Sequence, residues 1–301
     1  MEEKRHILIC VDDTDDVTKE TSTGKIADMI AAAICGKGAE MIRGITRHQL
    51  LLDDEIEYTS HNSSMCMEIM TELSLEKLEE VAAAELKAEM SVVSDPGLCF
   101  CILDELKNPD ALIAYGKRAQ NEIITKDMAY ETASEVGGTY LFEYGGSGIG
   151  IIGALAGVGL RISGNDGTIR GNKGEKLAGQ TLTVEEWKNH MGIEMVIDFD
   201  GKELDDNVEV TNKSKLKLAY FDHKITLVAR QNKKGEYIAC KKKDLYENDK
   251  PIIRWHQPCD KFEEDNDLGE CYSDGEIACW NCLYRRWTAD GYRCVAEKNE
   301  S

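Results

Sequence analysis

The stretch HILICVDDTDD, residues 6–16, decides the expected fold. Its first six residues form an apolar run, which predicts a buried β-strand, and the acidic residues that follow predict a loop. Apolar residues then recur at Ile26, Met29, Ile30 and Ala33, as on one face of a helix. A strand, an acidic loop and a helix in this order predict an α/β layer that binds its ligand where the strand ends.

Strand and helix patterns continue to alternate along the first half of the chain. We expect strands near residues 40–52, 63–70, 98–103 and 139–144, and helices that begin near Ser74, Pro109 and Lys126. Short strands separated by turns follow near residues 195–199, 207–211, 215–221, 226–231 and 236–240. The predicted class is α/β (α+β): a mixed-sheet region with helices over residues 1–185, a small antiparallel barrel or sandwich over 186–250, and a cysteine-rich tail over 251–301.

Composition excludes several classes of protein. Apolar residues make up 42% of the 301 residues, which suffices for a buried core, and no apolar run approaches the roughly 20 residues of a membrane span. The 11 cysteines and the lack of a signal-peptide pattern predict reduced thiols in a cytoplasmic protein. A net charge of −20 disfavours broad electrostatic binding of RNA or DNA.

The acidic loop is the first candidate site. Mg²⁺ prefers one or two carboxylates together with waters and phosphate oxygens, and Asp12, Asp13 and Asp15 supply carboxylates at the end of the strand. Ser22 and Thr23 then open a helix, whose first N–H groups and hydroxyls suit a phosphate. The alternative is a solvated acidic turn followed by an ordinary helix N-cap.

A glycine-rich stretch, GGSGIGIIGALAGVG at residues 145–159, is the second candidate site. It follows a predicted strand and opens a predicted helix, so Gly146, Ser147, Gly148 and Gly150 are candidates to cradle phosphates. No Gly-Lys-Ser/Thr follows, which excludes a Walker A loop. The alternative is close packing of a helix on a sheet through small residues.

The tail carries the third candidate site. Cys279 and Cys282 form a C-x-x-C pair that is flanked by Cys271 and Cys294. Four thiolates suit tetrahedral Zn²⁺, with an iron–sulfur cluster as a competing use. The alternative is a set of reduced, partly buried cysteines.

Taken together, the motifs resemble those of archaeal tRNA-isoleucine agmatinylcytidine synthetase (TiaS). Residues 9–15 resemble its opening strand and Asp-Asp-Thr-Asp, and Ser22-Thr23 stand at the spacing of its Thr-Thr pair. Residues 47–62 resemble its second motif, residues 94–97 its Asn-Pro-Gly segment, and residues 148–156 its Gly-Leu-Ile-Gly-Ala-Leu-Ala segment. The resemblance spans roughly residues 6–170. Tyr58, Ser60 and His61 depart from the family pattern, which has basic residues and a glycine there.

The resemblance implies a kinase-like domain and a ferredoxin-like domain that couple ATP hydrolysis to attachment of agmatine at a tRNA wobble cytidine. Asp12, Asp13 and Asp15 would then carry Mg²⁺-ATP, and Ser22 and Thr23 would contact phosphate or take a phosphoryl group. Thr14, Lys25 and Asn62 join them as expected nucleotide contacts.

Three hypotheses follow for the function. The first is an enzyme of this ATP-dependent type, with a nucleotide and a small amine as partners and with tRNA disfavoured by the acidic charge. The second is an ATP-dependent kinase or ligase that acts on a small molecule or a protein. The third is a metal-stabilised binding protein without catalytic activity.

Overall fold

A computed structural model describes residues 4–14, 22–51, 53, 56, 62–171, 175–198, 201–213, 216–232, 234–240, 285–288 and 291–294. The chain divides into two compact units, Met1–Ser163 and Gly164–Ser301. The first unit therefore ends before the boundary that we expected at residue 185.

The first unit is built on a five-stranded sheet. Its strands are β1 (Arg5–Asp12), β2 (Glu40–Gln49), β3 (Ser63–Thr71), β4 (Gly97–Ile102) and β5 (Thr139–Glu143), and they lie in the order β5-β4-β1-β3-β2. The described pairs between them are all antiparallel, with Cys10 opposite Cys66 on one side and Cys99 on the other. The apolar run of β1 thus occupies the centre of the sheet.

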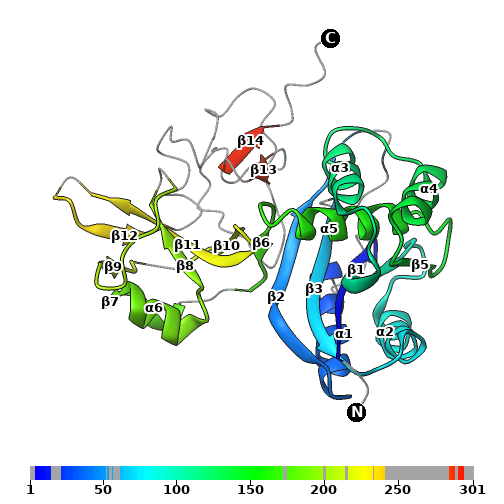
Figure 1. Ribbon diagram of the computed structural model, residues 1–301, viewed down its shortest axis with the longest axis horizontal. Helices are drawn as coiled ribbons and strands as arrows, with labels where there is room; N and C mark the ends of the chain where they lie inside the picture. The colour runs from blue at the N-terminus through cyan, green and yellow to red at the C-terminus, as the bar shows by residue number, and fades with distance from the viewer. Residues whose placement is uncertain are drawn as a thin grey trace, which may run out of the picture. The chain divides into compact units, whose positions relative to one another are not determined.

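Helices cover both faces of this sheet, as Figure 1 shows. The helices α1 (Thr23–Cys35) and α2 (Leu75–Glu89) pack on one face, and α3 (Pro109–Ala119), α4 (Lys126–Val136) and α5 (Ile151–Ile162) pack on the other. Alternate residues of β1 face the two layers: Ile7, Ile9 and Val11 belong to the first core, and Leu8 and Cys10 belong to the second. This explains why β1 is a continuous apolar run.

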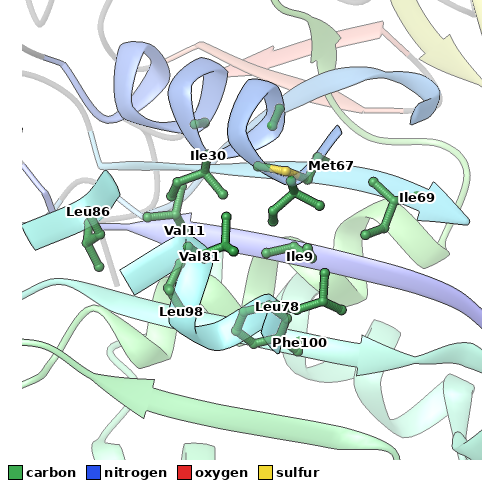
Figure 2. Close-up of a cluster of buried hydrophobic side chains, with 14 of the residues drawn as sticks. Ile9, Val11, Ile30, Met67, Ile69, Leu78, Val81, Leu86, Leu98 and Phe100 are labelled. Atoms are coloured by element: carbon green, nitrogen blue, oxygen red, sulfur yellow. The ribbon is translucent and has the colours of Figure 1, made fainter. Parts of the chain in front are cut away.

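The core between the sheet and the α1–α2 layer is formed by apolar side chains. Figure 2 shows Ile9, Val11 and Met67 from the strands together with Ile30 of α1 and Leu78 of α2. These five side chains are fully buried. Burial of this kind stabilises by roughly 1.5–3 kcal/mol for each large apolar side chain.

The order of elements β1-α1-β2-β3-α2-β4 repeats one motif twice. In each half, two strands joined by a helix leave a gap that a strand of the other half fills in antiparallel fashion, which gives the order β4-β1-β3-β2. This is the split βαβ arrangement of ferredoxin-like folds. It brings the end of β1, the start of β4 and the start of α1 to the same end of the sheet, where these strands end or begin.

The second unit mixes parallel and antiparallel pairs. The strands β6 (Thr168–Ile169), β10 (Ala219–Phe221), β11 (Lys224–Gln231), β12 (Tyr237–Ala239), β9 (Glu209–Thr211) and β7 (Thr181–Thr183) follow one another in space, and β8 (Met195–Ile197) pairs with β11. The pairs β8–β11 and β9–β12 are parallel, in addition to the antiparallel ladder predicted from the sequence. Helix α6 (Val184–Met191) buries Trp187, and β13 (Arg285–Thr288) pairs with β14 (Gly291–Cys294).

The α+β class predicted from the sequence is confirmed, and most elements of the first unit lie where they were expected. Ser74 is the N-cap of α2, and its side chain accepts the Lys77 N–H. Helix α6 and the short strands β6 and β7 were not predicted. The box formed by Thr183 and Glu186, in which each side chain bonds the backbone of the other residue, was the sequence signal for α6.

Candidate functional site

The candidate site lies at the carboxyl end of the central strand β1. Asp12, its last residue, pairs with Gly97, the first residue of β4, and is only 7% exposed. A carboxylate buried to this degree is costly unless positive charge, hydrogen bonds or a cation compensate it. The Asp12 side chain is therefore largely shielded from solvent, and both interpretations of the acidic loop, a magnesium site and an acidic turn before an ordinary N-cap, stay predictions.

The Asp12 carboxylate lies against helix α5. A β-carbon on Gly153, in the first turn of α5, would overlap Asp12 Oδ2. A β-carbon on Gly97 would overlap the backbone of Gly150 and Ile151. The glycine-rich segment and the acidic strand end, which the sequence suggested separately, therefore meet at one place.

Asp13 leaves the strand in an unusual backbone conformation, and Thr14 follows it. Asp13 has a φ of 55°, in the left-handed region that non-glycine residues seldom adopt. Thr14 is fully buried, and its Oγ1 donates to Oγ1 of Thr23, 3.1 Å away. This bond ties the acidic loop to the first residue of α1.

Two helices begin at this end of the sheet. Ser22 caps α1 by accepting the Lys25 N–H at 3.4 Å, and Lys25 itself is exposed. Helix α5 begins after Gly150, and its described neighbours provide no side-chain cap. The first N–H groups of a helix carry partial positive charge, so both helix starts favour an anion at this end.

The glycine loop before α5 is held by the side chains of Asp95 and Lys126. Gly145, Gly146 and Gly148 all have positive φ, which glycine adopts without strain. The Ser147 N–H donates to Oδ1 of Asp95, and the Ser147 carbonyl accepts from Lys126 Nζ at 2.5 Å. The Ser147 amide, which we expected to cradle phosphate, is thus bonded to a carboxylate, and that role stays a prediction.

Lys126 also pairs with Glu143 of β5, with 2.7 Å between Nζ and Oε2. Tyr130 donates to the other carboxylate oxygen of Glu143 at 2.5 Å. This hydrogen bond, with a smaller effect of burial, raises the pKa of Tyr130 to about 12. The same contacts, that of Lys126 first, lower the pKa of Glu143.

Asn62 stands where β3 begins and closes the end of the β2–β3 pair. The side-chain Nδ2 of Asn62 donates to Leu51 O at 2.7 Å. The backbone carbonyl of Asn62 accepts from the Leu50 N–H at 2.7 Å and from Gln49 Nε2 at 2.6 Å. These bonds give Asn62 a structural role, and its expected nucleotide contact stays a prediction.

A buried ionic cluster, which the sequence analysis did not single out, lies near the far end of α5. Arg161 is 1% exposed and donates to Glu68 Oε2 at 2.8 Å and to Thr46 Oγ1 at 3.0 Å. Glu68 also contacts His6 and Arg43. Burial raises the pKa of Glu68, but Arg161 above all, with His6 and Arg43, lowers it more, so the net pKa lies below the usual 4.5.

Several expected site residues fall outside the described ranges: Asp15, Cys271, Cys279 and Cys282. Cys294 is the last residue of β14, opposite Arg285. Within the described ranges, no three His, Cys, Asp or Glu side chains are grouped as a metal site would require. The zinc or iron–sulfur site in the tail stays a prediction. No helix in the described part of the chain has the length and apolar composition needed to cross a membrane.

Comparison with known proteins gives structural likeness only. No family model and no curated protein matches the chain. Similar solved structures include a tRNA fluorescent labeling enzyme, which is 19% identical with a TM-score of 0.45 over 51% of this chain and 36% of that chain. A complex of TiaS with its tRNA and ATP is 18% identical with a TM-score of 0.45 over 52% of this chain and 36% of that chain.

A complex of TiaS with its tRNA, AMPCPP and agmatine is 16% identical with a TM-score of 0.47 over 60% of this chain and 43% of that chain. The chain thus spans less than half the length of these three solved structures.

Proposed function

We propose that this chain is an ATP- and Mg²⁺-dependent enzyme that activates an acceptor oxygen by phosphoryl transfer and then joins an amine to the activated carbon. One observation carries the proposal. The carboxylate of Asp12 is buried at the end of β1 and packed against Gly153 in the first turn of α5. A carboxylate next to a helix start is a suitable place for a cation that bridges to phosphate oxygens.

The residues fit a magnesium ion. Asp12 and its neighbour Asp13 offer the one or two carboxylates that Mg²⁺ takes from protein, while water and phosphate fill its other positions. When bound, the ion would neutralise charge on the transferring phosphoryl group. Because residue 153 is glycine, Oδ2 of Asp12 can occupy the place where a β-carbon would otherwise stand.

The phosphate groups have several candidate partners on α1. Thr23 is 8% exposed, and its hydroxyl is linked to Thr14. Ser22 and Lys25 stand at the same helix start. Catalysis of phosphoryl transfer is mostly positioning and electrostatic stabilisation, which these groups would supply.

The proposed reaction has two steps. The acceptor oxygen attacks the terminal phosphorus of ATP, and ADP leaves with the electrons of the broken P–O bond. The amine nitrogen then attacks the carbon that carries the phosphorylated oxygen, loses a proton, and displaces inorganic phosphate. Agmatination of a tRNA wobble cytidine is one reaction of this kind.

The acceptor is a separate question from the nucleotide. The net charge of −20 weakens any long-range attraction for tRNA, which favours a small-molecule or protein acceptor. We therefore propose to test ATP turnover with tRNA and with small acceptors in parallel, each with and without agmatine. ATP turnover without any dependence on tRNA would favour a small-molecule or protein acceptor.

Titration calorimetry with Mg²⁺ and a non-hydrolysable ATP analogue tests the nucleotide site. We expect binding by the wild-type chain and loss of about tenfold or more in affinity for Asp12→Asn, because the neutral amide is a poor Mg²⁺ ligand. Asp104→Asn is the matched control, since Asp104 is exposed beyond the opposite end of β4. Equal affinities for the three proteins, or no binding by the wild type, would contradict the proposal and favour a non-catalytic binding protein.

A further inference from the structure

The loop of residues 91–96, between α2 and β4, connects the two candidate loops of the site. At its start, the Ser91 N–H donates to Thr14 O in the acidic loop, with 3.0 Å between the atoms. At its other end, the Asp95 carboxylate accepts the Ser147 N–H, and Asp95 O accepts the Gly150 N–H at 2.9 Å. The loop therefore runs from the acidic loop to the glycine loop.

The same loop is fixed internally and presents two apolar side chains. Ser91 and Ser94 are 1% and 5% exposed, and Ser94 Oγ donates to Ser91 O at 2.9 Å. Between them, Val92 is 94% exposed and Val93 is 72% exposed. Buried serines and exposed valines reverse the usual preference of these residue types, which makes the two adjacent valines a candidate contact for an apolar ligand.

We propose that Val92 and Val93 contact the nucleobase of the nucleotide whose phosphates and magnesium lie at Asp12. This inference rests on the proposed function. The acidic loop and the helix starts suit the charged end of a nucleotide, whereas a nucleobase offers a flat apolar face. Val92 and Val93 are exposed, and they lie in the loop that the hydrogen bonds of Ser91 and Asp95 hold between the two candidate loops.

Ile149 is a further exposed apolar residue, on the glycine loop that Asp95 holds. It is 43% exposed and directly precedes Gly150, whose N–H is bonded to Asp95 O. Two valines and one isoleucine are too small a patch for a stable protein interface, which needs roughly 800 Å² on each partner. So few side chains suit one face of a small ligand such as a base better than the surface of a macromolecule.

Titration with two ligands distinguishes contacts to the base from contacts to the phosphates. The Val92→Ser, Val93→Ser double variant and the wild type are titrated with a non-hydrolysable ATP analogue and with inorganic tripolyphosphate, each with Mg²⁺. We expect the double variant to bind the ATP analogue roughly fivefold to tenfold more weakly, because less apolar area is buried. Its affinity for tripolyphosphate should equal that of the wild type.

Ile42→Ser is the matched control, because Ile42 is 36% exposed at the start of β2, at the end of the sheet opposite Asp12. It should bind both ligands like the wild type. Unchanged affinity of the double variant for the ATP analogue would overturn the inference and leave the proposed function standing. An equal loss for both ligands would also overturn it, since the loop would then act on the phosphates. If the wild type binds neither ligand, the proposed function fails and the inference fails with it.

Discussion

The carboxylate of Asp12 and the Cα of Gly153 are in direct contact, so a β-carbon on Gly153 would overlap Asp12 Oδ2. Asp12 cannot keep its position if residue 153 gains a side chain. The contact joins the end of the central strand to the first turn of α5, and it makes the glycine part of the site although glycine has no chemistry of its own.

The first prediction concerns Gly153→Ala. We expect this change to lower the free energy of unfolding by about 1–3 kcal/mol through overpacking, and to abolish Mg²⁺-nucleotide binding because the Asp12 carboxylate is displaced. Urea unfolding and titration calorimetry on the same preparations measure the two effects.

Gly157→Ala is the matched control for this prediction. Gly157 lies one helical turn further along α5, where a β-carbon would overlap Ser64 Oγ and Cys10 Sγ but not Asp12. It should lose stability to a similar degree and still bind the nucleotide when folded. If both variants bind the nucleotide equally well, the contact with Asp12 is not needed for binding.

The sequence predicted the elements that form this site, but it did not predict that they come into contact. The apolar run before Asp12 and the helical stripe after Thr23 are local patterns, and both elements form where those patterns stand. The contact between Asp12 and Gly153 depends on how α5 packs across the sheet, which no local pattern encodes. The glycines of α5 did signal close packing, but not what they pack against.

The same reason explains what was missed. Glu68 and Arg161 are ordinary charged residues in sequence, and only the fold brings them together beneath α5. The valines at 92 and 93 have the composition of a strand or core, and only the structure shows that they are exposed. Helix α6 was missed because its eight residues span only about two helical turns, and a hydrophobic pattern that short does not distinguish a helix from a strand.

The second prediction concerns the buried pair of Arg161 and Glu68. Arg161→Met leaves the Glu68 carboxylate buried without its main partner, so we expect a loss of about 3–5 kcal/mol in the free energy of unfolding. Urea unfolding at pH 7 measures this loss. Arg118→Met is the control, because Arg118, in the last turn of α3, forms an exposed pair with Glu122 just beyond the helix, and it should lose less than about 1 kcal/mol. Similar losses for the two variants would contradict the assigned importance of the buried pair.

The third prediction is the pH dependence that follows from Glu68. The pKa of this carboxyl is lower in the folded chain than its usual 4.5, so its contribution to stability is complete above that value and is lost as pH falls through the folded-state pKa. We expect the unfolding free energy of the wild type to fall more steeply below about pH 4.5 than that of Glu68→Gln. Urea midpoints between pH 7 and pH 3 measure the two slopes. Parallel curves would show that Glu68 does not bind its proton more weakly in the folded chain.

The fourth prediction concerns the support of the glycine loop by Lys126. The Lys126 side chain bonds both Ser147 O and Glu143, but it is partly exposed, so Lys126→Met should cost less than about 1 kcal/mol of global stability. We expect faster hydrogen exchange of the backbone amides of residues 145–150, because the loop loses its anchor. Lys77→Met removes a comparable exposed pair with Glu80 on α2 and should leave this exchange unchanged. Equal exchange rates in the two variants would mean that Lys126 does not restrain the loop.

The fifth prediction concerns the buried thiols beneath α5. Cys10 and Cys99 face each other across β1 and β4 and are fully buried, and Cys101 is buried on the same face. Burial raises the pKa of Cys10 and Cys99 well above the usual 9.0 and that of Cys101 to about 12. Since the thiolate is the reactive form, all three should resist alkylation at pH 8 in the folded chain.

Cys35, at the end of α1, is partly exposed and provides the internal reference. Iodoacetamide labelling followed by mass spectrometry should modify Cys35 within a time at which Cys10, Cys99 and Cys101 stay unmodified, and all four should be modified in concentrated urea. Protection that persists until global unfolding would mean that the layer of α5 on the sheet does not open on its own. Labelling of Cys10 as fast as Cys35 would instead require local opening of α5, and because α5 carries Gly153, it would also require that the Asp12 contact opens with it.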